Sequence, residues 1–228
     1  IKAIDETGPD AIICGGDMFT AHAKDGILKY ESGFDLIKNL SGKYKVYYGN
    51  GNHEYKVKSF TKEYGNFYER YKNRLSKEGV IFLENESVDL NDKNIRITGL
   101  DLKLDYFKKV VKKKMEPDLI GKLVGDLGEK ERDKFQLLIA HNPQYFENYA
   151  KWGADLTVSG HVHGGIIRLP ILGGVISPSI ALFPKYDGGL YKKGDKTMIL
   201  GRGLGTHTIH VRFLNPGEVC VITVRGNN

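Results

Sequence analysis

Two histidines, His161 and His163, stand one residue apart in the segment LTVSGHVHGG, directly after an apolar, β-branched run. Histidine is both a common metal ligand and a proton carrier near neutral pH, so the pair indicates a site with chemistry of its own. Side chains at positions i and i+2 of an extended segment point the same way, so both rings can reach neighbouring ions. Glycines beside the pair let the backbone turn sharply and approach a ligand closely.

Polar residues of the same kind follow three other short apolar runs. Asp17 follows DAIICGG, Asn52 and His53 follow KVYYGNG, and His141 follows FQLLIA. Each run has the length and composition of a strand, and helical patterns lie between some of them. These features predict a layered α/β domain, in which ligands gather at the carboxyl ends of strands. If the strands share one sheet, all these polar residues converge on one rim.

Each residue alone has a commoner structural explanation. Asp17 could cap the next helix, Asn52 could occupy a turn beside glycine, and a single histidine is usually an ordinary surface or core residue. However, four of the seven histidines directly follow predicted strands, each with glycine or proline nearby. A shared metal site explains that coincidence with one cause.

The predicted ligands are imidazole nitrogens, a carboxylate and an amide oxygen, without a thiolate. Such a set suits Mn, Fe, Zn, Co or Ni rather than an iron–sulfur cluster. A carboxylate such as Asp17 can bridge two ions, and two-metal sites clamp the attacking and leaving oxygens of an in-line displacement. The ligand types alone do not identify the metal. The predicted cofactor is two divalent metal ions of unknown identity, with Mn favoured, and the predicted partner is a phosphate-ester substrate.

Four sequence blocks resemble the pattern of the calcineurin-like metallophosphoesterases. They are GGD, GNHE, AHNP and GHVH, and they occur in the order of the family pattern. The segments FPKYDGGLY and VRFLNPGEV are similar to the closing segments of the YkuE-like branch of bacterial phosphohydrolases in that superfamily. The resemblance implies a four-layer αββα sandwich, formed as a single domain over residues 1–228 with its first strand missing.

The resemblance also implies a role for each residue at the rim. Asp17 would bridge both ions, His163 would contribute to the first ion, and the second would be held by Asn52, His141 and His161. His53 would be the acid, or the oxyanion stabiliser, that helps the leaving alkoxide depart. The implied reaction is hydrolysis of phosphomonoesters or phosphodiesters by a metal-bridging hydroxide at a binuclear centre.

One block of the family pattern, D-x-H, has no counterpart before Asp17, because Asp5 in AIDETG lacks a histidine at the required spacing. The segment around Asp5 is predicted to be a helix end. Three explanations remain open: a lost first strand, which we favour, a site for one ion, or a second chain that completes the site. The alternative function is a non-catalytic binding or scaffold protein of the same fold.

Other features predict packing rather than chemistry. An aromatic stripe in the helical stretch Val57 to Lys77 is predicted to be core: Phe60, Tyr64, Phe67, Tyr68, Tyr71 and Leu75. Cys14 and Cys220 lie in apolar runs and are predicted to be buried strand residues rather than a disulfide. The remaining histidines, His22, His207 and His210, are predicted to be ordinary loop or strand residues.

The net charge of +6 is explained by scattered lysines and predicts no specific nucleic-acid partner. In YFKKVVKKKMEP, the apolar residues among lysines indicate either peripheral docking on an anionic membrane or, more commonly, packing on the same domain: Phe107, Val110, Val111 and Met115. The longest apolar stretch, LPILGGVISPSIALFP, is too interrupted to span a membrane. A cytoplasmic or a cell-envelope location, and any oligomeric state, remain open.

Overall fold

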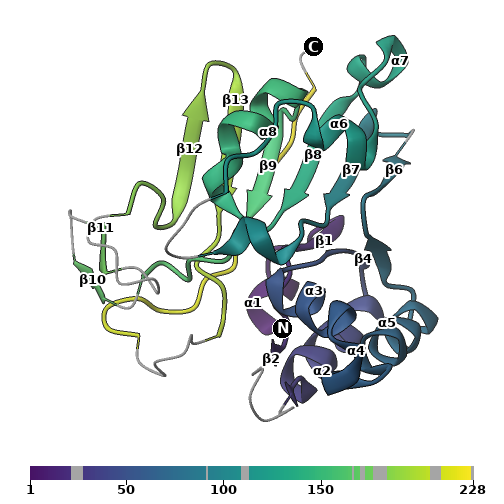
Figure 1. Ribbon diagram of the computed structural model, residues 1–228, viewed down its shortest axis with the longest axis vertical. Coiled ribbons are helices and arrows are strands. Elements are labelled where there is room, and N and C mark those ends of the chain that lie inside the picture. The colour runs from purple at the N-terminus through teal and green to yellow at the C-terminus, as the bar shows by residue number, and fades with distance from the viewer. Residues whose placement is uncertain are drawn as a thin grey trace.

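The computed structural model describes residues 1–21, 28–90, 92–108, 113–165, 167–169, 173–176, 184–205 and 212–226. Within these ranges two β-sheets face each other, and helices cover the outer face of each (Figure 1). His22, Val110, Val111, His207 and His210 lie outside the described residues.

The smaller sheet is parallel and has the strand order β1-β4-β5. Its strands are β1 (Ala11–Cys14), β4 (Lys45–Gly49) and β5 (Ile81–Leu83). Parallel neighbours need a crossover connection, and helices supply it here. These helices are α2 (Glu31–Ser41), α3 (Asn52–Ser59), α4 (Thr61–Tyr64) and α5 (Phe67–Lys77).

The larger sheet has the strand order β12-β13-β9-β8-β7-β6. Its four central strands are parallel to one another: β7 (Ile95–Leu100), β8 (Phe135–Ala140), β9 (Leu156–Ser159) and β13 (Lys196–Leu200). Antiparallel strands flank them, namely β6 (Glu86–Leu90) and β12 (Gly189–Lys193). Its outer face is covered by η1 (Leu104–Phe107), α6 (Leu119–Val124) and α8 (Phe146–Trp152).

Shorter elements complete the described part of the chain. They are α1 (Lys2–Asp5), α7 (Glu129–Arg132), η2 (Pro143–Tyr145), the hairpin of β2 (Thr20–Ala21) with β3 (Leu28–Lys29), and the hairpin of β10 (Ile167–Leu169) with β11 (Gly173–Ile176).

Alternation along β8 shows why the sheets are buried on both faces. Leu137 and Ile139 enter the apolar layer between the two sheets, whereas Leu138 and Ala140 pack with the helices outside. The inner layer is tight, because a Cβ atom added to Gly49 at the end of β4 would lie 2.5 Å from Cγ2 of Ile139. Helix, sheet, sheet and helix therefore form four layers, and the predicted αββα fold is confirmed.

One condition was not met and one local prediction was wrong. The four strands do not share one sheet, since β1 and β4 belong to the smaller sheet and β8 and β9 to the larger. The stretch Val57 to Lys77 is not one helix, because the chain leaves the helical conformation at Phe60 and at Gly65, whose φ is +58°. The aromatic stripe is core except for Phe60, which is 44% exposed at the joint between α3 and α4.

The cysteine prediction was correct for only one residue. Cys14 is buried in β1, but Cys220 is exposed and lies outside any strand. Both cysteines are free thiols.

Two apolar residues of the lysine-rich stretch after β7 lie within the described residues, and both pack on the same domain. Met115 is buried in the outer core, and Phe107 packs against the same cluster. The structure therefore gives no support to membrane docking through these two side chains. No helix in the described part of the chain is both long enough and apolar enough to cross a membrane.

Candidate metal centre

Three predicted ligands meet where strands of both sheets end. One oxygen of Asp17, after β1, and one ring nitrogen each of His141, after β8, and His161, after β9, all lie within 4.8 Å of one another. The carboxyl ends of β1, β8 and β9 thus point to the same side of the sandwich. Convergence across two facing sheets replaces the single rim that the sequence predicted.

Asp17 and His141 are in direct contact. His141 Nε2 lies 2.9 Å from Oδ2 of Asp17, and His141 Nδ1 donates to the carbonyl of Gly15 at 2.6 Å. A hydrogen bond from one ring nitrogen fixes the orientation of a histidine and leaves the other nitrogen for a metal. The backbone just before Asp17 therefore aims the ring of His141 at its carboxylate.

The electrostatics of this pair suit cation binding. Burial raises the pKa of Asp17, but His141 and the His53 amide outweigh burial and hold it well below its usual range. Burial lowers the pKa of His141, but Asp17 outweighs burial and raises it. Asp17 is therefore an anion that attracts positive charge to this position.

Asn52 begins α3 beside Asp17. The Oδ1 atom of Asn52 is buried and accepts no hydrogen bond from any residue that the structure describes. The residues on either side of Asn52 both lie against Asp17. The His53 amide donates to Oδ1 of Asp17 at 2.9 Å, and Gly51 is so near that an added Cβ atom would lie 2.2 Å from the same oxygen. An unsatisfied buried carbonyl oxygen costs about 1–3 kcal/mol, and a hard cation would satisfy it.

The ring of His53 is also fixed. The Ala21 amide donates to His53 Nδ1 at 3.0 Å, so Nδ1 carries no proton. In the neutral ring the proton then resides on Nε2, which can donate a hydrogen bond.

The two histidines of GHVH sit on a strained loop. The φ angles of His161 and His163 are +72° and +51°, and that of Asp17 is +55°. Non-glycine residues in the left-handed region cost on the order of 1–3 kcal/mol each and cluster at functional sites. Burial lowers the pKa of His163, with Asp17 acting in the opposite direction, so this ring lies within electrostatic reach of Asp17. His163 is not part of the three-residue group with closely spaced ligand atoms.

Glu54 is a central residue to which the sequence analysis gave no role. Its fully buried carboxylate accepts from the amides of Asp17 at 2.8 Å, Gly51 at 3.0 Å and Met18 at 2.9 Å, and from the hydroxyl of Tyr48 at 2.7 Å. Burial and the charge of Asp17 raise the pKa of Glu54 to about 7. The sequence did contain a signal for the structural role of Glu54, because a glutamate three residues after Gly51 has the spacing of a capping box at a helix N-terminus.

An ionic network lies behind the loop that carries Asn52. Lys58 of α3 pairs with Glu84, after β5, and with Asp101, after β7, at 2.9 Å; Lys72 also pairs with Glu84. Asn50 Nδ2 lies 3.2 Å from the same oxygen of Asp101. The network ties the ends of β4, β5 and β7 together across both sheets. It depends on distant pairings that the sequence pattern did not reveal.

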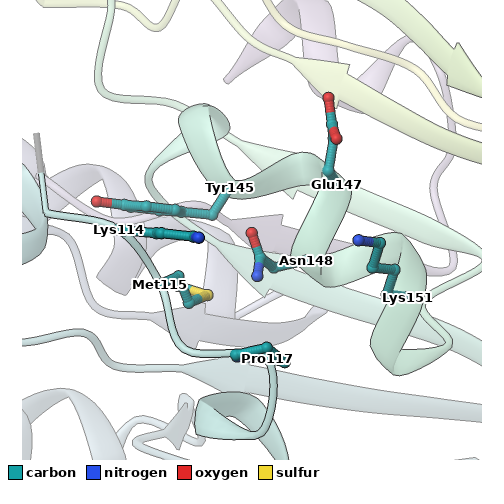
Figure 2. A pocket seen from close by; sticks show the side chains of 7 residues that line it. All are labelled: Lys114, Met115, Pro117, Tyr145, Glu147, Asn148 and Lys151. Carbon is teal, nitrogen blue, oxygen red and sulfur yellow. The ribbon is translucent and has the colours of Figure 1, made fainter.

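Phe107 is an apolar neighbour of the centre. The centroid of its ring lies 5.3 Å from that of the His161 ring, in an edge-to-face arrangement, and 6.1 Å from that of the His141 ring. A separate cavity of about 410 Å³ opens beside α8, which contributes Glu147, Asn148 and Lys151 to its lining (Figure 2). No predicted site residue lines that cavity.

Comparison with known proteins agrees with this geometry. The profile of the calcineurin-like phosphoesterase family matches residues 1–165, which include every predicted site residue. The chain belongs to this family. No solved structure gave a significant match.

Several family relatives are themselves functionally undefined. The chain is 29% identical to the uncharacterized metallophosphoesterase YkuE of Bacillus subtilis, over 100% of this chain and 72% of YkuE. It is 28% identical to an uncharacterized metallophosphoesterase of Helicobacter pylori strain J99, over 100% of this chain and 54% of that protein. It is also 29% identical to the UDP-2,3-diacylglucosamine pyrophosphatase LpxG of Chlamydia trachomatis, over 61% of this chain and 40% of LpxG. The chain thus spans about half the length of the Helicobacter relative.

Proposed function

We propose that this protein hydrolyses phosphomonoesters or phosphodiesters with bound divalent metal ions. The observation that carries the proposal is the meeting of Asp17, His141 and His161 with their ligand atoms within 4.8 Å. Membership of a phosphoesterase family supports the same class of reaction.

The donor set fits divalent cations. Asp17, Asn52, His141 and His161 would hold one ion, and His163 with Asp17 would hold another. The unsatisfied oxygen of Asn52, described above, supports its place in this set. When bound, such ions supply Lewis-acid polarisation of a phosphoryl group and activation of water.

Two residues of the chain would assist the reaction beside the metal ligands. His53 would donate a hydrogen bond from Nε2 to the departing oxygen, because Nδ1 is already occupied by the Ala21 amide. This tautomer favours oxyanion stabilisation over full proton transfer. Phe107 would exclude water from one side of the histidine rings and strengthen the local electrostatics.

The name of the Chlamydia relative widens the range of candidate substrates. LpxG is described as a pyrophosphatase of a UDP-linked, acylated sugar. A nucleoside-diphosphate-linked compound therefore belongs in the substrate panel beside simple aryl esters.

The test uses the purified chain with Mn²⁺ and aryl phosphomonoesters, aryl phosphodiesters and a UDP-sugar. We expect Asp17→Asn and His161→Ala to lower turnover by more than roughly 100-fold with unchanged circular dichroism. Asp89→Asn removes a carboxylate that pairs with Arg96 on β7 and serves as the control. Undiminished turnover in both site variants would refute the assignment.

Elemental analysis together with the ester assays separates catalysis from the alternative of a binding protein. We expect bound divalent ions in the wild-type chain and fewer in Asp17→Asn. A wild-type chain that binds ions but hydrolyses none of these esters would favour the non-catalytic alternative.

A further inference from the structure

The loop after β9 needs support from outside itself. His161, His163, Gly164 and Gly165 all have positive φ angles, so four of five consecutive residues are in the left-handed region. Within the loop, the amide of Val162 donates to the carbonyl of Gly160 and the amide of Gly165 donates to that of Val162. Neither of these two bonds involves the carbonyl of His163.

Asn215, about fifty residues downstream, holds this carbonyl. Its side-chain amide donates to the carbonyl of His163 at 2.7 Å and to that of Gly165 at 2.8 Å. Asn215 is only 1% exposed. The fit is close, because a Cβ added to Gly164 would lie 2.7 Å from Oδ1 of Asn215.

Arg212 in turn fixes the orientation of Asn215. Its Nε donates to the backbone carbonyl of Asn215 at 2.7 Å, and its Nη2 donates to the Oδ1 atom at 3.3 Å. The other guanidinium hydrogen bonds go to the carbonyls of Arg202, Gly203, Gly205 and Pro216. Because Oδ1 accepts from Arg212, both hydrogens of the Asn215 amide are directed at the histidine loop.

We propose that Asn215, oriented by Arg212, is a positioning residue for the metal centre: it holds the backbone of His163 so that the GHVH loop presents its rings to Asp17. This inference rests on the proposed function. It gives the VRFLNPGEV segment a physical role, although none of the described residues of that segment belongs to the group of candidate ligands.

The test compares Mn²⁺ binding by the wild-type chain, Asn215→Ala and Gln136→Ala, measured by titration calorimetry. Gln136 is a matched control: it is buried at the opposite end of β8, and its amide donates to the carbonyls of Glu131 and Lys134. Groups that orient metal ligands typically contribute 10–100-fold to affinity. We expect Asn215→Ala to bind Mn²⁺ about 10-fold or more weakly, and Gln136→Ala to bind like the wild type.

A kinetic readout separates positioning from general destabilisation. In Asn215→Ala, we expect excess Mn²⁺ to restore most of kcat, with KM for the ester unchanged. Equal Mn²⁺ affinity in wild type and a folded Asn215→Ala would overturn the inference and leave the proposed function intact. A wild-type chain that binds no Mn²⁺ would overturn both. If Asn215→Ala is unfolded, Arg212→Lys takes its place, because lysine keeps the positive charge but lacks the forked donors of the guanidinium. We expect Arg212→Lys to bind Mn²⁺ several-fold more weakly than the wild type. Unchanged binding in this variant would overturn the inference.

Discussion

The Nε2 atom of His141 lies 2.9 Å from Oδ2 of Asp17, although 124 residues separate the two in the chain. His141 directly follows β8 and Asp17 lies three residues beyond the end of β1, but the two strands belong to different sheets. The contact therefore joins the two halves of the sandwich at one point.

Gly51→Ala should disrupt the centre without replacing any proposed ligand. The added methyl group would lie 2.2 Å from Oδ1 of Asp17 and 2.6 Å from its backbone nitrogen, so the carboxylate must move. We expect Mn²⁺ affinity and turnover to fall by roughly 100-fold, since a small displacement of a catalytic group has this effect. Gly15→Ala is the control, because its methyl group would meet nothing within 4 Å. Equal losses in both variants would contradict the steric explanation.

His53→Ala should affect the departure of the leaving group rather than metal binding. A group that stabilises the departing oxygen matters most when the leaving group is a poor one. We expect turnover of an alkyl phosphodiester to fall by about 100-fold or more and that of a nitrophenyl ester to fall much less. Mn²⁺ affinity, measured by calorimetry, should stay close to wild type. Equal losses for both esters would show that His53 does not interact with the leaving oxygen.

Glu54→Gln should destabilise the fold and the centre together. Three backbone amides donate hydrogen bonds to the Glu54 carboxylate. The side-chain NH2 group of glutamine is itself a donor, so it would face these backbone donors and lose hydrogen bonds. We expect the free energy of unfolding in urea to fall by about 1.5–3 kcal/mol, the range for hydrogen bonds to charged groups. Tyr48→Phe, which removes a single donor to the same carboxylate, should cost about 1 kcal/mol. A larger loss in Tyr48→Phe than in Glu54→Gln would contradict this ranking.

Glu84→Gln tests the ionic network through pH. Burial acts to raise the pKa of Glu84, but Lys58 and Lys72 outweigh burial and lower it below 4.5. A carboxylate with a lower pKa in the folded state stabilises the fold above its unfolded pKa, and that stabilisation is lost as pH falls through the folded value. At pH 7 we therefore expect Glu84→Gln to be less stable than wild type by on the order of 1–2 kcal/mol. The difference should shrink as pH falls below 4.5. Glu63→Gln, at an exposed position of α4, should show little difference at either pH.

Much of this arrangement could be predicted locally. Short apolar runs bounded by glycine and polar residues are typical of buried strands, so the strands could be located from the sequence. The structure has strands in all four of these runs, DAIIC, KVYYG, FQLLIA and DLTVS. The sequence blocks also indicated the correct family. The individual ligand roles, the second ion and the single-domain organisation stay predictions.

The assignment of strands to sheets could not be predicted, because periodicity reports that a strand is buried and not which strand pairs with it. The same limit applies to Glu54, Asp101 and Asn215, whose partners lie far away in the sequence. Cys220 and Phe60 were misjudged for a related reason. An apolar neighbourhood in the chain does not ensure an apolar neighbourhood in space.

The tight contact between Ile139 and Gly49 has a consequence for metal selectivity. Since Asp17 follows one sheet and both His141 and His161 follow the other, the thickness of the apolar layer sets the spacing between the carboxylate and the imidazoles. Under the proposed metal binding, core volume and preferred ionic radius would therefore be linked quantities in this fold. Repacking the interior would then be a route to changing which cation is accepted, without altering any of the proposed ligands.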